Sequence, residues 1–160
     1  MLVNRGSIRM SPQRAYLRLP QGHGETGPKK EKEADMATGS KNDIPVAMQL
    51  GTFEKRRADW GGTDVSFESV ADDMDCRGIF GGLPDNRCPC PHWGFLFKGR
   101  ITVHYADRVE VIEPGQAYYM EPGHEPVYAA GTEVVEFSPT DKLNEVIAQV
   151  LKNVGAEQPA

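Results

Sequence analysis

The sequence predicts an all-β domain of short antiparallel strands, followed by one C-terminal helix and preceded by a disordered arm. Short apolar or alternating segments recur at regular spacing from residue 43 onward, and turns rich in Gly and Pro separate them. One stretch near the C-terminus has the three- and four-residue apolar spacing of a helix. The first 42 residues show no sustained apolar period. These three observations indicate an antiparallel sandwich or small barrel.

The predicted arm, residues 1–42, differs in charge from the rest of the chain. Residues 1–35 carry seven basic and four acidic residues, a net charge of +3, whereas residues 36–160 carry eleven basic and nineteen acidic residues, a net charge of −8. The arm is dominated by polar residues, Gly and Pro, which cannot bury enough surface to offset the entropy of ordering. Three explanations stay open: a solvated basic tail, a transit peptide, or a mis-assigned start upstream of Met36.

Strands are predicted wherever a short apolar or alternating segment lies between turn residues. In residues 64–70, Val65 and Phe67 alternate with Ser66 and Glu68, which is typical of a strand that is buried through one face. Glycine and proline mark the turns between segments, as in Glu113-Pro114-Gly115. The predicted strands are residues 44–50, 64–70, 77–80, 93–98, 101–105, 109–113, 117–121, 127–129 and 133–137.

A helix is predicted over residues 140–154. Six apolar residues recur there at steps of three and four: Leu143, Val146, Ile147, Val150, Leu151 and Val154. Ser138 or Thr140 is expected to cap its start, and Gly155 to end it. We expect the apolar stripe to pack on an outer face of the barrel, with a contact between two copies as the alternative.

Composition excludes several classes of protein. The chain has 160 residues, 39% hydrophobic and 26% charged, which suits one globular domain. No apolar run reaches the length of a membrane helix, so we expect no membrane partner. The net charge of −5 without a basic stripe argues against a nucleic-acid partner. The three cysteines are odd in number and two are crowded together, which favours a reducing cytoplasm over a disulfide framework.

Three segments occur in a characteristic order. Residues 92–99 form a strand that ends in a glycine turn, residues 114–123 begin with Pro-Gly and end in Pro-Gly, and residues 134–139 form a closing strand. In order and spacing, the segment from about residue 64 to 139 resembles the cupin superfamily. The resemblance implies a jelly-roll β-barrel over residues 43–139, with the helix packed on it. Cupins include oxygenases, isomerases, lyases, sugar-nucleotide epimerases and non-enzymatic binders, so the resemblance names no reaction.

The family's metal motif is not kept. Counting back from Gly99 places His92 where the motif has Glu, and places Asn86 and Cys88 near its two histidines. In the second motif the family's histidine would fall at Pro126. The three-His-one-Glu site that the resemblance would imply is therefore not inherited.

A different metal site is predicted from the run Cys-Pro-Cys-Pro-His. Cys88, Cys90 and His92 lie two residues apart, so their side chains face one side of an extended backbone, and prolines occupy the positions between them. Thiolate and imidazole suit Zn²⁺ or Fe²⁺, with His124 as a fourth ligand. The alternative is that no metal binds tightly and that the cluster shapes the mouth of a pocket.

We expect a protein that binds a small molecule inside the barrel. Of the adjacent tyrosines at 118 and 119, one should face the interior, whereas His104 should point outward. Two alternatives remain: a bacterial-type metal-dependent cupin enzyme with an atypical Cys/His site, and a structural module that forms a homodimer through an edge strand or the helix. The residues expected to line the ligand pocket are His92, Gly94, Leu96, Tyr118, Tyr119 and His124.

Overall fold

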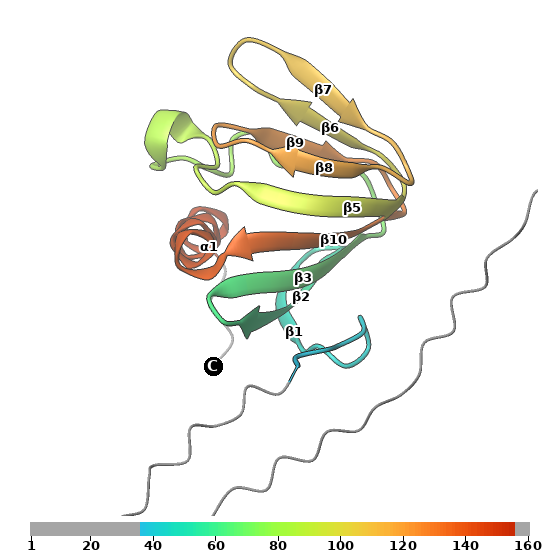
Figure 1. Ribbon diagram of the computed structural model, residues 1–160. Coiled ribbons are helices and arrows are strands. Elements are labelled where there is room, and N and C mark those ends of the chain that lie inside the picture. Colours follow the sequence, from blue (N-terminus) through green and yellow to red (C-terminus); the bar gives the residue numbers. More distant parts are fainter. Residues whose placement is uncertain (1–35, 156–160) are drawn as a thin grey trace, which may run out of the picture. The chain divides into compact units, whose positions relative to one another are not determined.

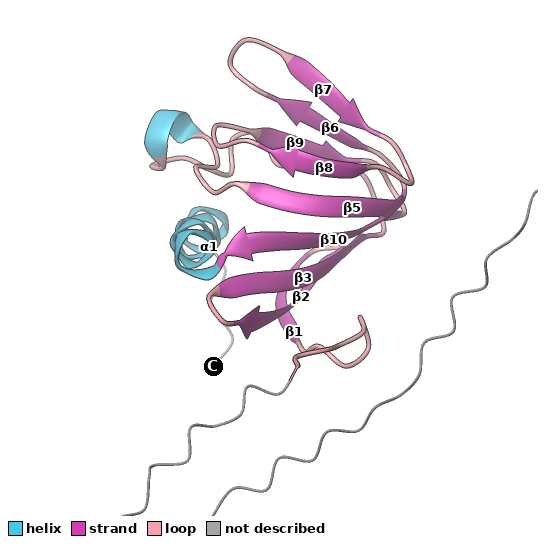
Figure 2. Cartoon of the chain, in the orientation of Figure 1, coloured by secondary structure: helices cyan, strands magenta, loops and turns pink. Residues whose placement is uncertain are grey.

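The computed structural model describes residues 36–155 (Figure 1). Within this range the chain forms ten strands and one α-helix, and Figure 2 shows how strongly strands dominate. No helix among these residues is long and apolar enough to cross a membrane. The elements are β1 (Val46–Leu50), β2 (Phe53–Trp60), β3 (Thr63–Val70), β4 (Met74–Asp75), a 3₁₀ turn (Pro84–Asn86), β5 (His92–Lys98), β6 (Ile101–His104), β7 (Val109–Ile112), β8 (Ala117–Met120), β9 (Glu125–Tyr128), β10 (Thr132–Pro139) and α1 (Thr140–Val154).

The strands form two antiparallel sheets. The larger sheet has the order β1-β2-β3-β10-β5-β8, and the smaller has the order β4-β9-β6-β7. Strand β10 comes last in the sequence but lies between β3 and β5 in the middle of the larger sheet (Figure 1). This arrangement confirms the predicted all-β antiparallel fold of jelly-roll type with one C-terminal helix.

Two local predictions need correction. The predicted strand at residues 77–80 is a turn, because Gly78 has a φ of +92° and Ile79 N donates to Cys76 O. The short strand β4 lies just before it. Strand β2 was not predicted, since its run of charged residues lacks an apolar alternation. It is a strand because every residue of it pairs with β3.

The polar side of β3 faces the interior. Ser66 and Glu68 are buried, while Phe67 on the opposite side is only half-buried. The β2–β3 register places Lys55 directly across from Glu68, so both side chains enter the space between the sheets. The alternation of residues 64–70 was thus detected in the sequence, and the structure shows that the side with Ser66 and Glu68 faces the interior.

Helix α1 is present, but it does not lie on an outer face. It follows β10 without a linker, so it begins at the end of the larger sheet (Figure 1). Leu143, Val146 and Val150 line the cavity between the sheets, and the helix therefore closes one end of the interior. Pro139 occupies the N-cap position with no side-chain cap bond, contrary to the expected cap, whereas Gly155 ends the helix in the left-handed conformation.

The predicted arm falls largely outside the described residues, since residues 1–35 are not described. From Met36 onward the chain is described, and a turn begins at Ser40. The backbone N and the hydroxyl of Ser40 both donate to Asp43 Oδ2, at 2.9 and 2.6 Å. Ile44 is buried directly after this turn. The turn at Ser40 therefore lies just before the predicted domain boundary at residue 43.

Candidate functional site

The two cupin-like motifs meet through a continuation of the β5–β8 pairing. His92 pairs with Met120 in that ladder, and Cys88 forms an isolated antiparallel bridge with His124 in the same register. Cys88 N donates to His124 O at 3.1 Å, and Gly123 N donates to Cys88 O at 2.7 Å. Prolines interrupt the ladder between these pairs because they lack an amide donor. The bridge brings Cys88 and His124 to directly opposite positions.

Three of the four predicted metal ligands come together in the interior. The donor atoms of Cys88, His92 and His124 all lie within 4.8 Å of one another. The two imidazole rings have centroids 5.0 Å apart, and Cys88 Sγ lies 3.6 Å from His92 Nε2. All three residues are buried, with exposed fractions of 2%, 6% and 1%. We name them the Cys–His–His group.

Cys90 does not join this group. The chain bends at this residue, so the carbonyl of Cys90 rather than its sulfur points toward the Cys88 thiol, at 3.8 Å from Sγ. The thiol of Cys90 contacts the carbonyl of Pro91 instead. The alternation expected for a regular extended strand is lost because prolines flank the bend on both sides.

Both imidazoles are oriented by a second hydrogen bond. His124 Nδ1 donates to the carbonyl oxygen of Glu121 at 2.6 Å, which leaves the lone pair of Nε2 free. His92 Nδ1 lies 2.6 Å from the hydroxyl of Ser138 on β10, and its Nε2 faces Cys88. A ligating histidine in proteins is held in this way by a partner on its other nitrogen.

Burial keeps the group uncharged. Burial, reinforced by the charge of Lys55, lowers the pKa of His92 to about 4. Burial and the neighbouring His92 lower the pKa of His124 to about 3. Burial also raises the pKa of the Cys88 thiol to about 12. Neutral imidazoles are the form that binds a metal, whereas the thiol must lose its proton on binding.

One donor separation in the Cys–His–His group matches that of two ligands on a tetrahedral transition-metal ion. Bonds of about 2.0 to 2.3 Å in tetrahedral geometry place two ligand atoms about 3.3 to 3.8 Å apart. The separation of Cys88 Sγ and His92 Nε2, 3.6 Å, lies in that range. Two nitrogens and one sulfur are a donor set that Zn²⁺ accepts and that Fe²⁺ tolerates.

A second buried polar cluster lies between the two sheets. Lys55 forms an ion pair with Glu68, and both side chains are buried. The hydroxyl of Tyr128 donates to the other carboxylate oxygen of Glu68 at 3.4 Å, and that of Tyr118 donates to Glu136 at 2.6 Å. We name these five residues the carboxylate cluster.

Charges within the carboxylate cluster act on one another. Burial, and next the charge of Glu136, raise the pKa of Glu68. Burial opposes the charge of Lys55, but Glu68 and Glu136 outweigh it and raise the pKa of that ammonium. Burial and Glu136 together raise the pKa of Tyr118, so its hydroxyl stays protonated and donates. One lysine faces two carboxylates, and the cluster therefore favours a further positive charge or a bound proton.

Except for Tyr118, sequence reasoning missed the carboxylate cluster. The sequence feature that could have revealed it is the alternation of polar residues in β3 and β10. Glu68 lies on the same buried face as Ser66, and Glu136 on the same buried face as Ser138. Gly94 contributes by having no side chain, because a Cβ there would overlap the ring and hydroxyl of Tyr118.

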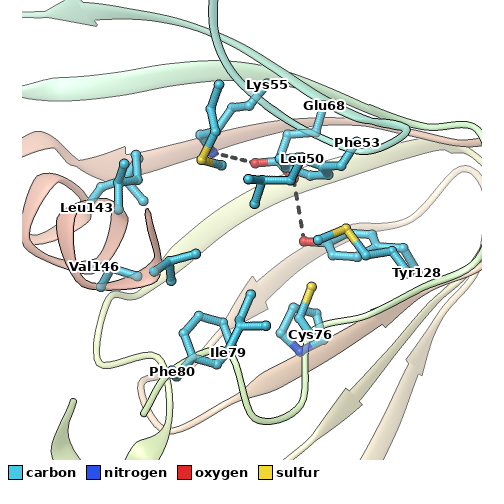
Figure 3. A pocket seen from close by; sticks show the side chains of 15 residues that line it. Leu50, Phe53, Lys55, Glu68, Cys76, Ile79, Phe80, Tyr128, Leu143 and Val146 are labelled. Atoms are coloured by element: carbon cyan, nitrogen blue, oxygen red, sulfur yellow. Dashed lines mark hydrogen bonds and ion pairs between the residues drawn. The ribbon is translucent and has the colours of Figure 1, made fainter. Parts of the chain in front are cut away.

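A cavity of about 90 Å³ lies between the sheets beside the carboxylate cluster (Figure 3). Lys55, Glu68 and Tyr128 supply its polar groups. The rest of its lining is mainly apolar and comes from both sheets and the helix, including Leu50, Phe53, Phe80, Leu143, Val146 and Val150.

The six residues expected to line a ligand pocket lie outside this cavity. His92 and His124 belong to the Cys–His–His group, and Leu96 is fully buried in the core. Tyr118 faces inward and Tyr119 lies on the outer face with 49% of its surface exposed, as their alternation requires. None of the six predicted residues lines the 90 Å³ cavity.

Comparison with family models and with curated protein sequences finds no match. Among solved structures, a protein of unknown function from Rhizobium leguminosarum bv. viciae 3841 is 13% identical with a TM-score of 0.50, covering 65% of this chain and 96% of its own. An RmlC-like cupin from Shewanella frigidimarina NCIMB 400 is 11% identical, with a TM-score of 0.47 and coverage of 66% and 92%. The polyketide cyclase RemF from Streptomyces resistomycificus is 13% identical, with a TM-score of 0.47 and coverage of 66% and 80%. The two-sheet topology and the two motifs that meet at Cys88 and His124 give this chain the fold of the cupin superfamily.

Proposed function

We propose that this protein binds a small organic molecule in the cavity between its sheets. The observation that carries the proposal is the cavity of about 90 Å³ with an apolar wall and a polar floor (Figure 3). Binding pockets in proteins combine apolar walls with a few placed polar groups, which fix the ligand's orientation. We propose that it does so in a reducing cytoplasm, because its three cysteines are free and buried.

The lining indicates the ligand's chemistry. Phe53, Phe80 and the aliphatic side chains of α1 suit a short hydrocarbon body. Lys55, Glu68 and the Tyr128 hydroxyl suit one polar head group at the floor. A volume of this size admits a molecule of only a few heavy atoms, unless side chains of the helix move aside.

Titration of isotope-labelled protein with n-butylamine, butyrate and n-butanol, followed by NMR, tests the proposal. We expect saturable shifts at Leu50 and Tyr128 with at least one of the three. Val146→Phe should abolish them, because the larger ring fills the cavity. Glu145→Gln, at an exposed position on the same helix, should leave them unchanged. Binding that persists in Val146→Phe, or the absence of saturable shifts with all three, contradicts the proposal.

A second candidate function is metal binding by the Cys–His–His group. The specific observation is the convergence of three buried donors whose imidazoles already have hydrogen-bonded partners. A metal there would supply a Lewis acid, and the protein would then be a metal-dependent enzyme with an atypical site. Ser138 and the Glu121 carbonyl would orient the two rings.

Elemental analysis of protein purified without a metal-affinity tag separates the two candidates. If the group binds zinc or iron, we expect close to one ion per chain and a sharp loss in His92→Ala. His104→Ala is the control, because His104 lies half-buried on β6 and outside the group. Equal metal content in both variants contradicts a site at His92.

A further inference from the structure

We propose that the molecule bound in the cavity carries a primary ammonium group. The inference rests on the proposed function, whose cavity it uses, and it names the chemical class of the ligand. The observation behind it is a buried carboxylate without a cationic partner, Glu136. Among the described residues no cationic side chain lies within ion-pair distance of this carboxylate, and its hydrogen bond comes from the uncharged hydroxyl of Tyr118.

The charges between the sheets do not balance. Lysine, aspartate and glutamate side chains are buried at four of the described positions, and three of the four are carboxylates. Glu68 is paired with Lys55, and Asp64 is paired with the half-buried Arg57 at 2.5 Å. Glu136 is left over, although only 3% of it is exposed. A buried charge without a partner is costly, so this interior is short of one cation.

Lys55 connects the cavity with Glu136. Lys55 and Glu68 line the cavity, whereas Glu136 does not. Burial lowers the pKa of Lys55, but the charges of Glu68 and Glu136 outweigh burial and raise it, so this ammonium lies within electrostatic reach of both carboxylates. Its flexible stem allows it to turn from one carboxylate to the other. A ligand ammonium at Glu68 would let Lys55 pair with Glu136, and each carboxylate would then have a cation.

Glu68 can accept a donor from the cavity side. One of its carboxylate oxygens pairs with Lys55 and the other accepts from the Tyr128 hydroxyl (Figure 3). A carboxylate has about four acceptor sites, so two stay open for the hydrogens of an ammonium group.

Other head groups do not correct the imbalance of charge. A ligand carboxylate beside Lys55 would be the fourth carboxylate in this interior, against the two cations Lys55 and Arg57. A ligand hydroxyl would add no charge and would leave Glu136 unpaired. An ammonium group is therefore the head group that the buried charges favour.

The dissociation constants of n-butylamine, butyrate and n-butanol, measured by NMR on the unmodified protein at about pH 7, give the first test. An alkylamine is protonated at this pH. We expect n-butylamine to bind about tenfold or more tightly than the other two, a difference of about 1.4 kcal/mol. If no probe binds, the proposed function itself is contradicted. If butyrate or n-butanol binds as tightly as n-butylamine, the proposed function stands, but Glu136 holds a proton instead of a cation and the ammonium inference is overturned.

Glu136→Gln tests the source of the preference. The substitution removes the charge, while the amide oxygen still accepts from the Tyr118 hydroxyl. The affinity for n-butylamine should fall about tenfold, and that for n-butanol should not change. Glu133→Gln is the matched control, because Glu133 lies on the same strand but pairs with the exposed Lys98. A preference for the amine that survives Glu136→Gln, or that both variants lose equally, overturns the inference.

Lys55→Met provides a second measurement, through rescue of stability. In this variant both Glu68 and Glu136 lack a cation, so the interior is short of two. A ligand that binds the folded state raises its stability, and n-butylamine should therefore raise the urea midpoint of Lys55→Met more than it raises that of the unmodified protein. Sodium butyrate and n-butanol at equal concentration are the controls for ionic strength and for the hydrocarbon chain. A midpoint that responds equally to all three compounds shows that the cavity does not select a cation, and it overturns the inference.

Discussion

The inner face of the larger sheet combines buried charged groups with the apolar core, whereas its outer face exposes aromatic rings. The inner face carries the buried Lys55–Glu68 pair and Glu136, whereas the outer face carries half-exposed Trp93 and Phe95. An antiparallel sheet with one solvated side ordinarily packs its apolar side inward. In this chain, the alternation of side chains along the strands shows that the sheet has two faces, but it does not show which face is buried.

Each face carries a feature that has a cost. A buried ion pair contributes little net stability, because desolvation of the charges offsets their attraction. Exposed aromatic rings make a protein prone to association. The following substitutions compare the two faces by urea unfolding at fixed protein concentration.

The largest effect is expected at the buried ion pair. Lys55→Met should lower the free energy of unfolding by about 3–5 kcal/mol, because it leaves Glu68 buried without its partner. Lys98→Met, which breaks the exposed pair with Glu133, should cost less than about 1 kcal/mol. The double variant Lys55→Met/Glu68→Leu should recover most of the loss, and a double variant as unstable as the single one would contradict a coupled pair.

Gly94→Ala should cost about 3 kcal/mol, toward the upper end for overpacking. The added Cβ would overlap Tyr118 and lie 2.8 Å from the carbonyl oxygen of Val135, which cannot move without disturbing β10. Gly81→Ala is the control, since a Cβ there meets only the Asn153 amide at 3.7 Å. Equal tolerance of both changes would show that Tyr118 does not lie over the strand at Gly94.

The adjacent tyrosines compare the two faces directly. Tyr118→Phe should cost about 1–2 kcal/mol, because Glu136 loses the hydroxyl that donates to it. Tyr119→Phe should change the free energy of unfolding by less than about 0.5 kcal/mol, since its side chain lies on the outer face. A larger loss in Tyr119→Phe than in Tyr118→Phe would show that Tyr119, rather than Tyr118, lies in the interior.

The smallest changes in the free energy of unfolding are expected for two serines on the inner face. Ser66 Oγ is buried without a hydrogen-bond partner, so Ser66→Ala should be neutral or slightly stabilising. Ser138→Ala should cost about 1 kcal/mol, because its hydroxyl contacts His92 Nδ1. A clear loss in Ser66→Ala would reveal a partner for that hydroxyl, such as an ordered water.

Features with a local cause could be predicted from the sequence. Turns at glycine and proline, the strand of residues 64–70 and the helix of residues 140–154 follow from spacing alone. The meeting of His92 and His124 followed from the motif resemblance, and the structure confirms it.

Features that depend on distant partners could not be predicted. The charged residues of β2 form a strand because β3 pairs with them, and Glu68 is buried because Lys55 lies across from it. The cavity exists because α1 packs at one end of the two sheets. The spacing of apolar residues predicts the helix but does not predict where the helix packs. Cys90 departs from its expected direction because a bend between two prolines interrupts the extended backbone.

The central position of β10 also governs how the chain can fold while a ribosome is still making it. Strands β3 and β5 are synthesised early, but each lacks its neighbour until residues 132–139 emerge. Until then both expose an unpaired edge, which is prone to aggregation. A nascent chain cut short before β10 therefore lacks the strand that joins the two halves of the sheet, and we expect it to require a chaperone or to be degraded.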